Sequence, residues 1–181
     1  MNLCGEKVVL RPIEEADFSR IVHWSTLVEV NRFSDGDYPT SLEECQTWLQ
    51  RSNSNRYQIR LAIVLDDRII GDIELDQITW RSGDAELRIR IGETALWDKG
   101  YGTDAILTLL KYSFFSLNLS RIYLKVYADN LRAIRCYQKA GFKKEGRLTR
   151  EIEGMGKRDI ILMRILKREF ERKQRRLEKV S

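Results

Sequence analysis

Two closely spaced glycines, Gly100 and Gly102, lie in a polar turn between an alternating apolar run typical of a β-strand (85–91) and an amphipathic run typical of a helix (105–117). The first backbone N–H groups of a helix have no partner within the helix, and the helix dipole adds partial positive charge there. Glycine lets the backbone bend and approach a bound group closely. The turn therefore indicates a ligand that carries phosphate.

The spacing of these glycines excludes two common phosphate loops. A P-loop needs Gly, four residues and then Gly-Lys-Ser/Thr, and this arrangement is absent from the turn. The dinucleotide fingerprint Gly-x-Gly-x-x-Gly would place its third glycine at Ala105. A second motif is needed to say which phosphate compound is bound.

The second motif, NLRAIRCYQKAGF, covers residues 130–142 and follows another strand-like run over 121–127. Asn130 favours a helix N-cap, and Gly141 favours the left-handed residue that ends many helices. Tyr137 lies on the apolar stripe of the helix between them. The sequence predicts a capped helix that follows a strand and presents a tyrosine.

With both motifs in place, the chain resembles the GCN5-related N-acetyltransferase (GNAT) superfamily, and within it the branch of polyamine and ribosomal-protein acetyltransferases. The turn is similar to the family's pyrophosphate loop, Gln/Arg-x-x-Gly-x-Gly/Ala. The second motif is similar to its Asn-x-x-Ala-x-x-x-Tyr-x-x-x-Gly-Phe helix. Trp97 departs from the loop pattern, because it stands where the family often has Gln or Arg.

The resemblance implies acetyl-CoA as cosubstrate and no metal. In the family, the fourth and fifth strands splay apart, and the pantetheine arm pairs with the free edge of the fourth strand as an added strand would. The cofactor-binding residues implied by position are Ile89, Arg90, Ile91, Lys99, Gly100, Tyr101, Gly102, Thr103, Asn130, Ala133 and Tyr137.

The implied reaction is attack of a primary amine on the thioester, followed by departure of the CoA thiolate. Tyr137 is the candidate acid, because the resemblance places this tyrosine beside the leaving sulfur. A phenol pKa of ~10 and a thiol pKa of ~8.5 suit a short hydrogen bond or proton transfer. Without the resemblance, Tyr137 reads as a core residue of its helix. A backbone N–H near Ile91 is the candidate donor to the oxyanion.

Glu86 has two interpretations. It is the candidate general base, because it lies on the strand beside the expected thioester. It also fits cross-strand charge pairing, since acids alternate over 72–76 on the preceding strand while Glu86, Arg88 and Arg90 alternate on its own strand. Both interpretations remain open from the sequence.

Two acidic residues, Asp35 and Asp37, are the candidate substrate residues, because they lie in the loop between the first two expected helices. Acidic groups there would attract a cationic amine. We therefore expect direct acetylation of a small cationic metabolite such as a polyamine, an aminoglycoside or an amino sugar, in a ternary complex. The alternatives are acetylation of a protein N-terminus or lysine, and a CoA-binding sensor without catalysis.

The elements that position these residues predict an α/β fold. Antiparallel strands come first and a β-α-β-α-β order follows, which indicates a mixed, mostly antiparallel sheet flanked by helices. The resemblance implies a sheet splayed between its fourth and fifth strands. Strands are expected over 7–12, 59–65, 69–78, 85–91, 121–127, 143–151 and 158–165, and helices over 16–24, from 41, over 104–117 and over 131–140.

The length of 181 residues and the 43% apolar content predict a single domain with a hydrophobic core. The resemblance implies that this is an N-acetyltransferase domain over 1–166, followed by a basic helix or tail over 167–181. That last segment has seven basic and three acidic residues, so it carries +4 of the net charge of +5. The body of the domain is close to neutral, which disfavours nucleic acid as a partner.

No run approaches the ~18 to 20 apolar residues of a membrane span, and the N-terminus lacks a signal-peptide pattern. Cys4, Cys45 and Cys136 have no metal-ligand spacing. We therefore expect a cytoplasmic protein with reduced thiols, no metal site and no membrane partner. A homodimer is expected only by analogy with the family.

Overall fold

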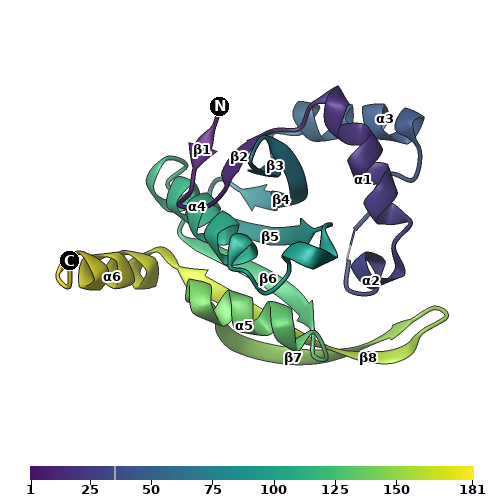
Figure 1. Ribbon diagram of the computed structural model, residues 1–181. Coiled ribbons are helices and arrows are strands. Elements are labelled where there is room, and N and C mark those ends of the chain that lie inside the picture. Colours follow the sequence, from purple (N-terminus) through teal and green to yellow (C-terminus); the bar gives the residue numbers. More distant parts are fainter. Residues whose placement is uncertain (35) are drawn as a thin grey trace.

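The structure, a computed structural model, describes residues 1–34 and 36–181. A single eight-stranded sheet has the order β1-β2-β3-β4-β5-β6-β8-β7 (Figure 1). Its neighbouring strands are antiparallel, except that β5 and β6 are parallel. The strands are β1 (Leu3–Cys4), β2 (Val9–Pro12), β3 (Ile59–Leu65), β4 (Arg68–Thr79), β5 (Asp84–Ile91), β6 (Arg121–Tyr127), β7 (Lys143–Ile152) and β8 (Gly156–Leu166).

The helices gather into two groups, one around α1 to α3 and the other around α4 and α5 (Figure 1). The helical segments are η1 (Glu15–Asp17), α1 (Phe18–Ser25), α2 (Val28–Asn31), α3 (Leu42–Ser54), η2 (Thr94–Leu96), α4 (Tyr101–Phe115), α5 (Leu131–Ala140) and α6 (Lys167–Glu178). None of the helices within residues 1–34 and 36–181 has the length and apolar content needed to cross a bilayer.

Two hydrophobic clusters cover the two faces of the sheet. Strand β3 shows the division, because Leu61 and Ile63 belong to the cluster with α4, α5 and α6, while Ala62 and Val64 belong to the cluster with α1, α2 and α3. Successive side chains of a strand point to opposite faces. The apolar run of β3 is therefore explained by burial on both faces.

The predicted fold class is confirmed by this mixed, mostly antiparallel sheet with flanking helices. The N-terminus differs from the prediction, because β2 begins at Val9 and a short β1 pairs with it. The carboxylate of Asp104 accepts hydrogen bonds from the backbone N–H groups of Glu6, Lys7 and Val8, at 3.0, 2.8 and 2.9 Å. Asp104 is almost a hundred residues away from these amides in the sequence, so no local sequence pattern predicts the contacts.

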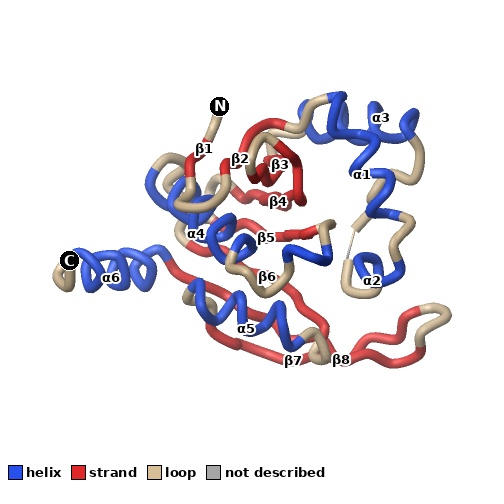
Figure 2. The backbone as a smooth tube through the Cα atoms, in the orientation of Figure 1, coloured by secondary structure: helices blue, strands red, loops and turns tan. Residues whose placement is uncertain are grey.

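The expected basic helix or tail over 167–181 forms α6 through Glu178. Its Phe170 is 1% exposed and packs against the rings of Phe114 and Phe115, with centroids 5.4 and 5.9 Å away. Figure 2 shows α6 at one end of the molecule and the β7–β8 hairpin running beneath α5 toward the other. The basic segment is thus fastened to the core of the domain by an aromatic side chain.

Candidate active site

The sheet opens between β5 and β6, which are the fourth and fifth strands if the two-residue β1 is not counted. The described pairs between them stop at Glu86 and Tyr123, whereas β5 continues to Ile91 and β6 continues to Tyr127. On its other side, β5 stays paired with β4 as far as Ile91. The second half of β5 therefore has one edge without a strand partner.

The groups exposed on that edge follow from the alternation of an antiparallel ladder. Gly92 donates its N–H to the carbonyl of Ile70 in β4, at 2.9 Å. Because bonded and non-bonded pairs alternate, the backbone groups of Ile89 and Ile91 face away from β4 and toward the opening. The Ile91 carbonyl accepts a hydrogen bond there from the indole N–H of Trp97, at 2.9 Å. The N–H of Ile91 and both backbone groups of Ile89 remain directed at the opening.

A cavity of ≈ 250 Å³ occupies the opening. One wall comes from β5 and another from Lys125, Val126 and Tyr127 of β6. All of the predicted cofactor-binding residues except Lys99 line it, namely Ile89, Arg90, Ile91, Gly100, Tyr101, Gly102, Thr103, Asn130, Ala133 and Tyr137. The fold therefore brings the two sequence motifs and the free edge of β5 to one place.

The glycine turn presents helix amides to this cavity. Gly100 is the N-cap of α4 and has a left-handed φ of 86°. The first bond inside the helix runs from the N–H of Asp104 to the carbonyl of Gly100, at 3.0 Å. The N–H groups of Tyr101, Gly102 and Thr103 precede that bond, so helix geometry leaves them free for a ligand. This arrangement can bind an anion.

A second helix begins at the same cavity. Asn130 caps α5, because its side-chain oxygen accepts a hydrogen bond from the N–H of Ala133 at 3.3 Å. One turn later, the Tyr137 side chain is almost fully buried, and its ring meets Phe142 edge-on with the centroids 5.9 Å apart. Burial, followed by the nearby Cys136, raises the pKa of Tyr137 well above its usual range. The phenol therefore stays protonated at neutral pH, as a hydrogen-bond donor must.

Cys136 also lines the cavity, and its sulfur lies 3.2 Å from the hydroxyl oxygen of Thr103. Burial raises the pKa of this thiol, against the smaller lowering effect of Thr103. The nucleophilic form of cysteine is the thiolate. Cys136 is therefore poorly suited to accept an acyl group at neutral pH.

Comparison with known protein families fits this geometry. A model of the acetyltransferase (GNAT) domain matches residues 7–143, which is most of the chain. The chain belongs to the GNAT acetyltransferase family. It is an acetyl-CoA-dependent N-acetyltransferase, and the family, the enzyme class and the cosubstrate predicted from the sequence are confirmed.

Individual relatives agree with the family. The uncharacterized N-acetyltransferase p20 of Bacillus licheniformis is 28% identical over an alignment of 177 residues, which covers 93% of this chain and 98% of that protein. Spermidine N(1)-acetyltransferase of Escherichia coli K12 is 29% identical over 147 residues, covering 81% and 78% of the two chains. The crystal structure of spermidine N-acetyltransferase from Vibrio cholerae in complex with CoA and spermine has a TM-score of 0.81 and 27% identity, covering 91% and 98%.

Within this GNAT site, three of the predicted residues are not among the described residues that line the cavity. Lys99 is exposed, although its carbonyl accepts a hydrogen bond from the amine of Lys7 at 3.2 Å. Asp37 is also exposed. Glu86 is almost fully buried. A further predicted residue, Asp35, lies outside the described residues.

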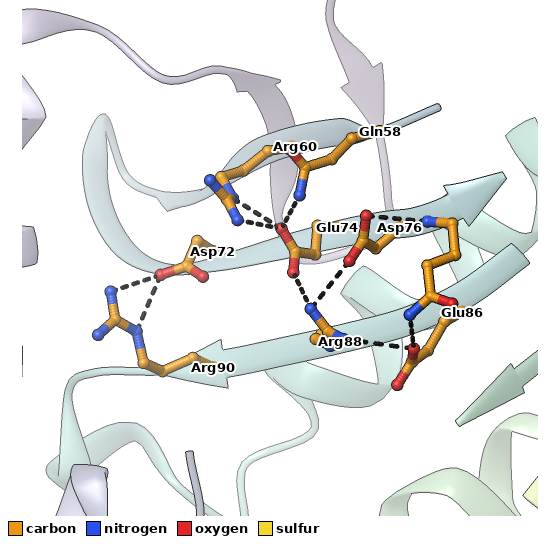
Figure 3. A network of polar contacts seen from close by, with 9 residues as sticks. Gln58, Arg60, Asp72, Glu74, Asp76, Glu86, Arg88 and Arg90 are labelled. Carbon is orange, nitrogen blue, oxygen red and sulfur yellow. Dashed lines mark hydrogen bonds and ion pairs between the residues drawn. The ribbon is translucent and has the colours of Figure 1, made fainter. Parts of the chain in front are cut away.

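Glu86 belongs to a network of charges across β4 and β5 (Figure 3). Its carboxylate accepts hydrogen bonds from Gln77 at 3.1 Å and Arg88 at 3.3 Å, and lies 4.0 Å from the amine of Lys125. Arg88 also reaches Asp76 at 3.0 Å. These contacts are the cross-strand pairing that the alternating charges suggested. Of the described residues that contact Glu86, Lys125 alone also lines the cavity.

Several cavity residues escaped the sequence reasoning. Glu29 of α2 and Phe33 line the cavity. The sequence did not indicate Glu29, because a four-residue helix is too short to leave a periodic pattern. Arg132 lies inside the second motif and also lines the cavity. Its guanidinium carbon is 3.3 Å from the centroid of the Trp97 ring. The two side chains are 35 positions apart, so only the fold reveals their contact.

No group of three or more histidine, cysteine or acidic side chains in the described ranges is arranged to hold a metal ion.

Proposed function

We propose that this GNAT enzyme transfers the acetyl group of acetyl-CoA to a primary amine of a small cationic metabolite, by direct attack in a ternary complex. The observation that carries the proposal is a single cavity that joins the free edge of β5, the first amides of α4 and the phenol of Tyr137. Each of these supports one requirement of acetyl transfer.

The cofactor is held mainly by backbone groups in this proposal. The N–H and carbonyl of Ile89 offer the pantetheine arm the hydrogen bonds that a neighbouring strand would make. The amides of Tyr101, Gly102 and Thr103 bind the diphosphate. Because backbone groups make these contacts, the cofactor can bind even though Trp97 stands where the family often has Gln or Arg.

The chemical step then needs an oxyanion donor and an acid. The N–H of Ile91 faces the opening and serves as the oxyanion donor, which is worth a few kcal/mol when well aimed. Tyr137 donates a hydrogen bond to the departing CoA sulfur. The high pKa of the Cys136 thiol supports direct attack by the amine over an acyl-cysteine intermediate.

The acceptor end of the cavity supports a cationic amine. Glu29 lines the cavity from α2, and its exposed carboxylate would attract an ammonium group. The sequence analysis expected Asp35 and Asp37 to attract the cationic amine. We assign this role to Glu29, in the helix that precedes their loop. The spermidine N-acetyltransferases among the relatives support a polyamine as the first compound to test.

The test is release of free thiol from acetyl-CoA with a panel of amines, namely spermidine, spermine, an aminoglycoside, an amino sugar and peptides with free N-termini. We expect a small polyamine to give the highest kcat/KM, and Glu29→Gln to raise its KM more than it lowers kcat. Activity confined to peptides would replace the proposal with protein acetylation. Saturable CoA binding without thiol release for any amine would indicate a sensor.

A further inference from the structure

Trp97 and Arg132 form a stacked pair at the wall of the cavity. The indole N–H of Trp97 donates to the carbonyl of Ile91, and the Arg132 guanidinium carbon lies 3.3 Å from the centroid of the indole ring. Both side chains are half-buried and both line the cavity. The pair therefore connects the first turn of α5 to the free edge of β5.

Arg132 differs from the other closely stacked arginines of this protein. Among the described residues, four further arginines stack within 5 Å of an aromatic ring, and each is also paired with a carboxylate: Arg60 with Glu74, Arg90 with Asp72, Arg121 with Glu145 and Arg158 with Asp129. Arg132 has the shortest of these ring distances. None of the ion pairs or hydrogen bonds among the described residues involves its guanidinium.

An arginine stacked in this way keeps its N–H donors available. The ring occupies a face of the guanidinium, while the five N–H groups point outward in its plane. Burial lowers the pKa of Arg132, and the neighbouring Asp98 opposes that effect, so the group remains a cation at neutral pH. Arg132 is therefore a cation in contact with the Trp97 ring, and it lines the same cavity as the first residues of α4 and the N-cap of α5.

We propose that Arg132, held against the ring of Trp97, binds a phosphate of the nucleotide end of acetyl-CoA. This inference rests on the proposed cofactor site. Trp97 then has two tasks, because its ring orients the arginine and its N–H fixes Ile91, the residue that faces the thioester. A pre-oriented guanidinium loses less conformational entropy on binding than a free one, and charge-assisted bonds to phosphate are strong.

The first experiment measures CoA affinity by calorimetry in Arg132→Gln. We expect a loss of roughly tenfold to a hundredfold, the range for a charge-assisted hydrogen bond. Arg56→Gln is the matched control, because Arg56 stacks on Tyr57 at 5.1 Å outside the cavity. The control is expected to bind CoA as the unaltered protein does, and thermal unfolding checks that both variants are folded.

Two further compounds locate the contact. Acetyl-pantetheine has no phosphate, so its kcat/KM is expected to change less than about twofold in Arg132→Gln. With dephospho-CoA, a persisting loss of affinity assigns the contact to the diphosphate, and a vanishing loss assigns it to the 3′-phosphate. An equal loss for acetyl-pantetheine, or no loss for CoA, overturns the inference. If the unaltered protein binds no CoA at all, the proposed function itself fails.

A double-mutant cycle tests the part assigned to Trp97. If the indole orients the arginine, Trp97→Ala and Arg132→Gln affect CoA affinity non-additively, and the double variant binds about as weakly as Arg132→Gln alone. Additive losses would separate the two residues. Trp97→Phe keeps a ring beneath Arg132 and removes the N–H to Ile91, so we expect it to retain most of the affinity for CoA.

Discussion

In the proposed mechanism, the buried phenol of Tyr137 interacts with the sulfur that leaves. Desolvation raises the pKa of Tyr137, so the hydroxyl stays neutral across the working pH range. A CoA thiol with a pKa of ~8.5 is a far stronger acid than such a phenol. Full proton transfer to the departing thiolate is therefore uphill. Tyr137 is best described as a hydrogen-bond donor that stabilises the thiolate as it forms.

Tyr137→Phe is expected to lower kcat by ~10²-fold or more, because it removes the donor to the sulfur. The Kd for CoA is expected to stay within about twofold, since the backbone contacts remain. An assay of free-thiol release measures kcat, and calorimetry measures the Kd for CoA. In the unaltered enzyme, kcat is expected to show no decline from phenol ionisation between about pH 8 and 10, because the raised pKa of Tyr137 keeps the proton on. Unchanged turnover in Tyr137→Phe would remove this residue from the mechanism.

For Glu86, we expect a structural role, because its carboxylate accepts hydrogen bonds from Gln77 and Arg88. Glu86→Gln is expected to destabilise the fold by about 1–3 kcal/mol, the usual effect of weakening a buried hydrogen-bonded charge. Urea unfolding measures that loss. The pH dependence of kcat/KM is expected to keep its shape. A shift of its acid limb with normal stability would instead make Glu86 the general base.

The turn between β5 and α4 is the element that positions the first backbone amides of α4 at the cavity. Its glycines have different roles. Gly100 occupies a left-handed conformation that L side chains adopt at a cost, whereas a Cβ at Gly102 would meet Cys136, Ile91 and Ile89 at ordinary contact distances of 3.6 to 4.0 Å. The first glycine shapes the turn, and the second keeps space open in the cavity.

This difference predicts opposite results for a matched pair of variants. Gly100→Ala is expected to lose roughly 1–2 kcal/mol of stability, because alanine is strained in a left-handed conformation. It is also expected to bind CoA more weakly, because relief of that strain would change the orientation of the backbone amides that follow Gly100. Gly102→Ala is expected to keep its stability, with any loss confined to cofactor affinity. Thermal unfolding and calorimetry measure both. Equal stability of the two variants would contradict the role assigned to Gly100.

Elements with strong local signals were predictable from the sequence. The strand over 121–127 and the helix over 131–140 have the expected bounds, because alternation, an Asn cap and a closing glycine agree. The helix expected from 104 begins at Tyr101, since Gly100 is the cap and the Asp104 carboxylate is used by distant amides. The stack of Trp97 on Arg132 depends on tertiary contact, which no local pattern encodes.

The basic C-terminal segment cannot simply be deleted to test whether its charge binds nucleic acid, because it also packs against the core. Because Phe170 is buried against α4, deleting 167–181 to test for RNA binding would also open the core. Replacing the exposed Arg175 and its neighbour Arg176 with Gln is the cleaner test. Salt-dependent RNA binding that these changes abolish would contradict the expectation that nucleic acid is not a partner.

Phe170→Ala is expected to destabilise the whole domain by about 3–5 kcal/mol, the usual range for removing a buried aromatic ring. Urea unfolding followed by circular dichroism measures the loss. Leu177→Ala is a matched control on the same helix, because Leu177 is 59% exposed. A loss for Phe170→Ala no larger than that of the control would mean that α6 is not fastened to the core.

Backbone amide signals offer the most direct view of where the cofactor lies. In a titration of ¹⁵N-labelled protein with CoA, we expect the largest and jointly saturating changes at Ile89, Ile91 and the amides of Tyr101, Gly102 and Thr103. Those changes would place the cofactor in the opening between β5 and β6, with its phosphates at the start of α4. Absence of saturation, or changes confined to α3 and the outer strands, would contradict that placement.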